Sequence, residues 1–85
     1  MEFSIIWSDK AIDQLAKLER PIGKRIFNKV GKLKQNPHRY VTRQVGSKSY
    51  KLRVGDYRVL LDIDGNQLSI DVVEVGPRKN IYKKK

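Results

Sequence analysis

Residues 50–63 read YKLRVGDYRVLLDI, a stretch in which apolar and polar residues alternate on both sides of a Gly-Asp pair. Alternation with a period of two is typical of β-strands whose two faces meet different surroundings. In the first strand Lys51 and Arg53 lie on the face opposite the apolar residues. The Gly-Asp pair predicts a turn, and the two strands therefore form a hairpin.

The second strand of this hairpin continues the same division. Tyr57, Val59, Leu61 and Ile63 share one face, and Arg58 falls on the other. The sequence thus predicts that three cations project from the polar side of a hairpin whose other side is core, an arrangement suited to a nucleic-acid backbone. Because Arg58 is assigned to the exposed side, its replacement by alanine is expected to leave no cavity in the core.

The N-terminal half is predicted to be a strand followed by two helices. Residues 2–7 alternate as a strand does, and Ser8 and Asp9 are candidate N-caps. Apolar residues then recur at helical spacing over residues 10–35. Pro21 divides this stretch into two helices, because proline disfavours helical geometry in the preceding residue and fits a first helical turn.

The remaining chain is predicted to contain turns and a last strand. Asn36-Pro37 ends the second helix, residues 38–42 form a loop, and Arg43 begins a candidate short strand. Asp64-Gly65-Asn66 is a strong hairpin turn, and residues 67–75 form the last strand, which Gly76-Pro77 ends.

The predicted order is therefore β-α-α-β-β-β, which defines an α+β fold. We expect a helical hairpin packed on one face of a mostly antiparallel four-stranded sheet. The 85 residues suffice for one domain, spanning residues 1–85, with a modest core.

The charge balance indicates an acidic partner. The chain has 19 Lys and Arg residues against 9 Asp and Glu, a net charge of +10, and no acid between Arg20 and Gly55. Such an excess favours RNA, DNA, a ribosomal surface or an acidic protein as partner, although solubility or adaptation to an ionic or hot environment is the alternative. The absence of cysteine excludes disulfides, thiolate metal sites and a thiol nucleophile. Without a recognisable signal peptide or membrane span, a cytoplasmic location is expected.

Few residues suit conventional acid–base catalysis. His38 is the only histidine and is predicted to lie in a surface loop. Glu74 shares its parity with Ile70 and Val72 and is expected at the end of the last strand, in a structural or exposed role. A free-standing, efficient nuclease is therefore not expected. Lys51 could act as a base, because the neighbouring cations favour the neutral amine.

The order of elements and three motifs resemble the RelE/ParE toxin superfamily. The motifs are the Lys-Leu-Arg strand, the Gly-Asp-Tyr-Arg turn and the closing Val-Gly-Pro-Arg-Lys-Asn-Ile-Tyr, all within residues 45–82, while the similarity covers nearly the whole chain. The chain is more similar to RelE-type messenger-RNA interferases than to ParE-type gyrase inhibitors, because Arg58, Arg78 and Tyr82 stand where RelE-type members keep functional residues.

The resemblance implies a toxin of a toxin–antitoxin pair that cleaves messenger RNA in the ribosomal A site. The 2′-hydroxyl attacks the adjacent phosphate, without metal or other cofactor. The implied roles are general base or transition-state stabiliser for Lys51, a second cation for Arg53 and scissile-phosphate contact for Arg58. Arg78 would stabilise or protonate the leaving oxygen, and Tyr82 would stack on or orient the base. Further RNA contacts are assigned to Lys48, Lys79, Lys24 and Arg25.

The chain departs from the family pattern at two positions. Ser49 stands where some relatives carry a lysine, which leaves the identity of the base open, and Pro77 replaces a histidine before Arg78. Two alternatives therefore stay open: a ParE-type toxin that inhibits DNA gyrase without RNA cleavage, and an inactive RelE-like module that binds RNA or the ribosome.

The resemblance also implies partners. These are the ribosome, messenger RNA and a cognate RelB-like antitoxin, acidic and wrapped around the toxin in a heterodimer or heterotetramer, with no membrane partner. An acidic amphipathic segment could dock on the helical hairpin or on the open sheet face, where Leu60 lies near Arg58. The helical side is favoured, since it offers more area, with inhibition by displacement of the tail or by bulk.

Overall fold

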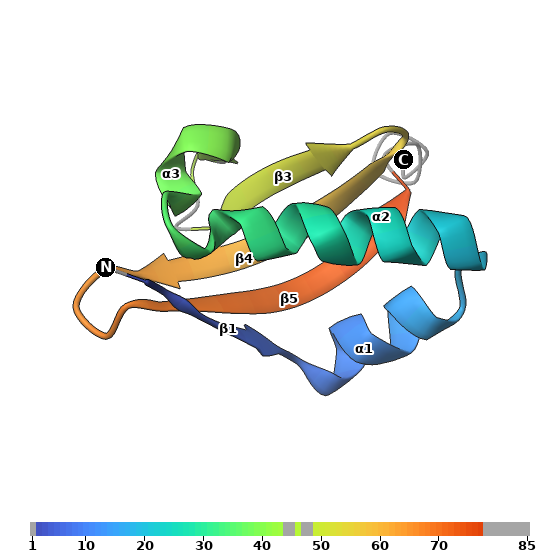
Figure 1. Cartoon of the computed structure of the whole chain (residues 1–85), viewed down its shortest axis with the longest axis horizontal. Coiled ribbons are helices and arrows are strands. Elements are labelled where there is room, and N and C mark those ends of the chain that lie inside the picture. Colours follow the sequence, from blue (N-terminus) through green and yellow to red (C-terminus); the bar gives the residue numbers. More distant parts are fainter. Residues whose placement is uncertain (1, 44–45, 47–48, 78–85) are drawn as a thin grey trace.

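The chain forms a mixed sheet with helices attached, and the computed structural model describes residues 2–43, 46 and 49–77 (Figure 1). The elements in chain order are β1 (Ser4–Trp7), α1 (Asp9–Ala16), α2 (Arg20–Gly31), the 3-10 turn η1 (Lys32–Lys34), α3 (Pro37–Tyr40), β2 (Thr42–Arg43), β3 (Tyr50–Val54), β4 (Tyr57–Asp64) and β5 (Ser69–Pro77). The strand order in the sheet is β1-β5-β4-β3-β2, with β1 parallel to β5 and the other pairs antiparallel.

The predicted α+β fold is confirmed. The structure differs from the prediction in the stretch between the end of α2 and the start of β3. The sheet has five strands rather than four, because Thr42 and Arg43 pair with Lys51 and Tyr50 at its edge. Residues 38–40 belong to the short helix α3 rather than to a loop. Pro37 occupies the first turn of this helix, where its missing N–H costs no hydrogen bond.

The helix boundaries follow local sequence signals. The Ser8 hydroxyl accepts a hydrogen bond of 3.0 Å from the backbone N–H of Ala11 and so caps α1. Pro21 lies in the first turn of α2, as predicted. The apolar residues of α2 and η1 that face the sheet, Ile26, Val30 and Leu33, are completely buried. They pack with the apolar side chains of β3, β4 and β5.

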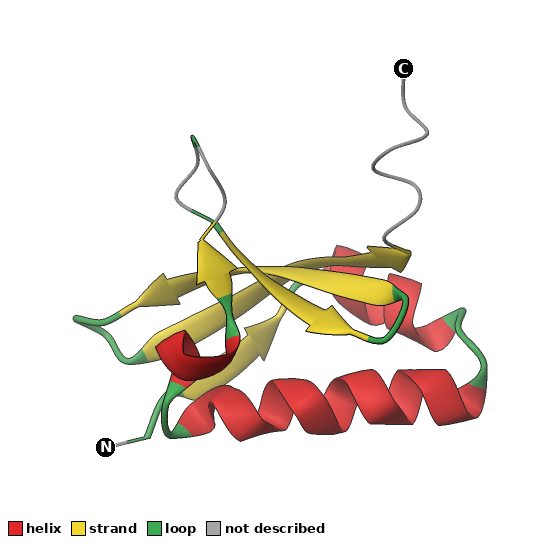
Figure 2. Cartoon of the chain, turned by 90° about the horizontal axis from the view of Figure 1, so that it is seen from above, coloured by secondary structure: helices red, strands yellow, loops and turns green. Residues whose placement is uncertain are grey.

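The sheet consequently has one apolar face and one polar face. Figure 2 shows α2 lying along one side of the sheet. The buried residues of the strands, among them Leu52, Val59, Leu61 and Ile70, belong to the same core cluster as those of α2. Side chains of opposite parity on β3 and β4 project from the other face, and this polar face carries the candidate site.

A β-bulge changes the parity of β5. Leu60 pairs with Glu74 while Leu61 pairs with Val72, so Val73 is an extra residue in β5. Val72 and Val75 are both buried although they are three positions apart. Glu74 therefore lies opposite Leu60, on the polar face. The prediction that Glu74 shares the face of Ile70 and Val72 is wrong, because it assumed uninterrupted alternation.

The turn between β3 and β4 offers a test of backbone strain. Gly55 has a φ of 59°, a left-handed conformation in which an added Cβ costs about 1–2 kcal/mol. We expect Gly55→Ala to lower the free energy of unfolding by about 1 kcal/mol in urea titrations. Gly65→Ala, in the turn between β4 and β5, is the matched control, since no atom lies within 4 Å of its added Cβ. Equal losses in both variants would contradict this reading.

Candidate functional site

The candidate site is a group of cations on the polar face of β3 and β4. Arg53 of β3 pairs directly with Arg58 of β4, and Lys51 pairs with Leu60. Residues opposite each other in an antiparallel pair project from the same face. The register therefore brings Lys51, Arg53 and Arg58 together, and we call these three residues the cation cluster.

Arg58 is buried, which the sequence did not predict. Its exposed fraction is 8%, whereas Arg53 is exposed and Lys51 is partly exposed. Nε and Nη1 of Arg58 have no hydrogen-bond partner within the part of the chain that the structure describes. Buried polar groups in folded proteins are usually paired, because an unpaired one retains its desolvation cost. These unpaired donors make Arg58 a candidate anion-binding group.

Among the described residues, Glu74 is the counter-charge of Arg58. Its Oε2 lies 3.6 Å from Nη2 of Arg58, and its Oε1 lies 3.5 Å from Nζ of Lys10. Sequence reasoning assigned no function to Glu74 or Lys10. The spacing Ile70, Val72, Val75 could have indicated the bulge, because a step of three interrupts a period of two.

Helix α1 is attached to the bulged part of β5. The Ser8 hydroxyl donates a hydrogen bond of 3.0 Å to the carbonyl of Val73. The side-chain carbonyl of Gln14 accepts one of 2.7 Å from the backbone N–H of Val75. Together with the Lys10–Glu74 ion pair, these contacts link three positions of the α1 region to three consecutive residues of β5.

Lys24 and Arg25, the two cations of α2 that were assigned to RNA contacts, have different surroundings in the structure. The Arg25 guanidinium lies beside the β3–β4 turn, with Nη1 3.6 Å from the position of a Cβ on Gly55. Lys24 instead lines a groove between α1 and α2. Arg25 is thus close to the end of the hairpin that carries the cation cluster, and Lys24 is not. Lys48, Arg78, Lys79 and Tyr82 lie outside the described residues.

His38 and Ser49 have defined local contacts. The exposed His38 on α3 lies edge-on to the Tyr50 ring, with ring centroids 5.3 Å apart. The Ser49 hydroxyl donates a 3.1 Å hydrogen bond to Oδ1 of Asp62. Over residues 2–43, 46 and 49–77, no group of three or more His, Cys, Asp or Glu side chains could hold a metal ion.

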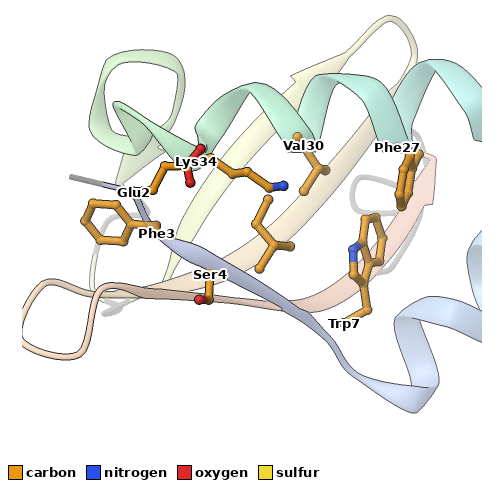
Figure 3. A pocket seen from close by; sticks show the side chains of 9 residues that line it. Glu2, Phe3, Ser4, Trp7, Phe27, Val30 and Lys34 are labelled. Carbon is orange, nitrogen blue, oxygen red and sulfur yellow. The ribbon is translucent and has the colours of Figure 1, made fainter.

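A second surface, on the helical side, is apolar. Ile12 of α1 and Phe27 of α2 are 51% and 55% exposed, and both line the groove between the helices, with Leu15, Leu18 and Pro21. Phe27 also stacks on Trp7, with ring centroids 5.7 Å apart. Figure 3 shows these two rings side by side in a neighbouring pocket between β1 and α2. We call the α1–α2 groove and this stack the apolar strip.

None of the described helices is both long enough and apolar enough to cross a membrane.

Solved structures place this architecture among the RelE-like toxins. The RelBE2 toxin–antitoxin complex of Mycobacterium tuberculosis superposes with a TM-score of 0.82 at 23% identity, covering 92% of this chain and 100% of that one. The archaeal RelE–RelB complex of Pyrococcus horikoshii gives 0.79 at 21% identity, over 92% and 97%. The YoeB/ParE toxin of Agrobacterium tumefaciens gives 0.74 at 12% identity, over 88% and 98%.

Sequence comparison identifies the family. The model of the family described as ParE toxin of type II toxin–antitoxin system, parDE, matches residues 5–82. The chain belongs to this family of toxins. No curated protein matches it. The predicted membership of the RelE/ParE superfamily is confirmed.

Proposed function

We propose that this toxin is a ribosome-dependent endoribonuclease that cleaves messenger RNA in the ribosomal A site and so inhibits translation. The observation that carries the proposal is the buried guanidinium of Arg58. Two of its nitrogens have no hydrogen-bond partner among the described residues, and Arg53 lies directly opposite. A buried cation with unpaired donors, beside further cations, suits a phosphate that is present only in the complex with substrate.

The proposed reaction is a metal-independent transesterification. The 2′-oxygen attacks the adjacent phosphorus, the bond to the 5′-oxygen breaks, and a 2′,3′-cyclic phosphate and a 5′-hydroxyl result. Lys51 is proposed to accept the 2′-hydroxyl proton or to stabilise the transition state. Arg58 and Arg53 neutralise the charge that develops on the phosphate oxygens. Arg78 is proposed to stabilise the leaving 5′-oxygen, which takes up a proton from Arg78 or from water to become the 5′-hydroxyl, and Tyr82 is proposed to stack on a base.

The cation cluster contributes charge stabilisation but little means to orient a flexible RNA. Geometric alignment of the 2′-oxygen, phosphorus and leaving oxygen is a large part of the barrier. We propose that the ribosome supplies this alignment, which would confine cleavage to translated messenger RNA. This division of labour explains why a protein with a single, exposed histidine could still cleave RNA.

The second candidate is a ParE-type toxin that inhibits DNA gyrase and cuts no RNA. The family match itself favours it, since that family is described by its ParE members. One pair of assays separates the candidates. The 5′ ends of messenger RNA are mapped after incubation with ribosomes and this protein, and gyrase supercoiling is measured in parallel. Cuts at fixed codon positions support the nuclease, whereas intact RNA with blocked supercoiling supports the gyrase inhibitor.

Because the protein is strongly basic, we expect its binding to ribosomes or RNA to depend on salt concentration. The affinity of the protein for ribosomes or RNA should fall steeply between about 50 and 200 mM salt, because each phosphate neutralised by Lys or Arg releases counterions. The slope of log affinity against log salt, measured by fluorescence anisotropy or sedimentation, estimates the number of phosphates contacted. A flat dependence would show that the charge does not determine binding.

We further propose a RelB-like antitoxin, acidic and amphipathic, as the partner of the apolar strip, in a heterodimer or heterotetramer. Ile12 and Phe27 are exposed in a groove that Arg20 and Lys24 also line. Apolar area flanked by cations matches an acidic segment that folds on binding. The neighbouring structures from M. tuberculosis and P. horikoshii are themselves toxin–antitoxin complexes.

The groove can be tested with two matched variants. Ile12→Gln should weaken the complex by about 10- to 100-fold, since a buried isoleucine contributes about 1.5–3 kcal/mol. Ile6→Gln is the control, because Ile6 is 54% exposed but lies on β1 and does not line the groove. The measurement is co-expression with the neighbouring open reading frame, then size-exclusion chromatography and titration calorimetry. Equal weakening by both variants would contradict docking in the groove.

A further inference from the structure

We propose that Glu74 is a positioning residue for Arg58, and that Lys10 of α1 holds Glu74 in turn. The Glu74 carboxylate fixes one end of the guanidinium, so that Nε and Nη1, which are buried without an acceptor among the described residues, are held for a phosphate that reaches them in the complex with substrate. The inference rests on the proposed function in one respect, namely that Arg58 contacts a phosphate of the RNA. It adds residues outside the cation cluster to that site.

The register explains how the guanidinium comes to lie across β5. Arg58 pairs with Gly76, and a Cβ on Gly76 would lie 3.9 Å from Nη2 of Arg58. A Cβ at that distance would be in ordinary van der Waals contact, so the guanidinium lies directly over Gly76. Glu74 lies two residues earlier on the same face, with Oε2 3.6 Å from that same Nη2. The contact is an ion pair longer than a hydrogen bond, so it orients the group without saturating its donors.

Like charges on β3 make this counter-charge necessary. Arg53 lies directly opposite Arg58, and adjacent cations on one face repel each other. Without Glu74, repulsion would favour conformers that turn the Arg58 guanidinium away from Arg53. Glu74 contacts two cations, Arg58 and Lys10, and Arg53 lies opposite Arg58, so these four side chains together keep a net positive charge. Attraction for a phosphate is thus retained.

The bulge and α1 together hold Glu74 in place. The extra residue Val73 turns Glu74 to the polar face, and the Ser8 hydroxyl bonds the carbonyl of Val73. Lys10, two residues further along, reaches Oε1 of Glu74 at 3.5 Å, while Oε2 faces Arg58. Each carboxylate oxygen therefore has its own cation, which restricts rotation of the Glu74 side chain.

This arrangement predicts opposite effects on binding and on chemistry. In Glu74→Gln the negative charge is lost, so RNA should bind as tightly as in the wild type or more tightly. The Arg58 guanidinium is no longer oriented, so the single-turnover cleavage rate on saturated ribosomes should fall about tenfold or more. Glu74→Asp keeps the charge and should retain more of the rate than Glu74→Gln. A parallel fall in affinity, or an unchanged rate, would overturn the inference.

Lys10→Gln and Lys17→Gln form a matched pair at the two ends of α1, since Lys10 lies in its first turn and Lys17 is its C-cap. Lys17 pairs at 3.2 Å with Asp13, and both side chains are exposed. Each variant removes one positive charge, within α1 or at its C-cap, but of the two lysines only Lys10 contacts Glu74. We expect a lower cleavage rate for Lys10→Gln and the wild-type rate for Lys17→Gln. Equal rates in the two variants would exclude a role for the Lys10–Glu74 pair.

A binding measurement without cleavage separates this inference from the proposed function. The Nε–Hε NMR signal of Arg58 is assigned by its loss in Arg58→Lys, and inorganic phosphate is titrated into the full chain. In the wild type we expect a sharp signal that phosphate shifts, and in Glu74→Gln a broadened one. Identical sharp signals and shifts in both proteins would overturn the role of Glu74 while sparing the phosphate contact. No shift in the wild type would instead contradict the contact, and with it the proposed function.

Discussion

Arg58→Met is expected to abolish RNA cleavage while leaving the protein as stable as the wild type, or more stable. Loss of one phosphate-directed donor costs about 2–4 kcal/mol at the transition state, which corresponds to a fall of about 30- to 1,000-fold in rate. Methionine fills much of the volume of the buried side chain and adds no polar group. It removes two buried nitrogens that have no hydrogen-bond partner among the described residues. Replacing a buried charge by an apolar side chain is often neutral or stabilising.

The measurements are single-turnover cleavage on ribosomes and urea unfolding of the same preparation. Arg53→Met is the control, because Arg53 lies opposite Arg58 but is exposed. We expect it to leave stability unchanged. A destabilised Arg58→Met would show that the guanidinium mainly holds the sheet together. Wild-type cleavage by that variant would contradict the assignment of Arg58 to the phosphate.

Ile26→Ala should have the largest effect on stability, a loss of about 2–5 kcal/mol in the free energy of unfolding. Ile26 is completely buried between α2 and the sheet, so truncation removes apolar contacts and leaves a cavity that the rigid sheet cannot fill. Ile12→Ala is the matched control, since this isoleucine on α1 is 51% exposed. Urea titration of both variants is the measurement. A loss for Ile12→Ala as large as for Ile26→Ala would indicate that α1 folds against more than the described core.

Periodic sequence patterns predicted most of the fold, because burial on one face imposes them directly. Pro21 marked the start of α2, and the alternation around Gly55 predicted both strands of the hairpin and the turn between them. The short edge strand Thr42–Arg43 was predicted only in part, since two residues carry no period. Helix α3 was missed because one helical turn after Asn36-Pro37 has the composition of a loop.

The sequence predicted that the site residues share one face of the sheet, but it did not predict that Arg58 is buried. Parity alone places Lys51, Arg53 and Arg58 together, and the register agrees. Parity gives the face on which a side chain lies and not its exposure, so the burial of Arg58 beside Gly76 and Glu74 could not be read from it. The Glu74 contact needed the bulge at Val73, whose position depends on how β4 and β5 pair in three dimensions.

The parallel pairing of β1 with β5 has a consequence for how the chain is made. Ser4 pairs with Ser69, so the first strand to leave the ribosome lies beside the last of the described strands. Such long loop closure delays folding until the distant partner is available. β5 also pairs with β4 along most of its length, and Val72 and Val75 of β5 belong to the core cluster. A nascent chain that stops short of residue 69 therefore exposes its apolar face and lacks Glu74, so the toxin fold can form only after β5 has been synthesised.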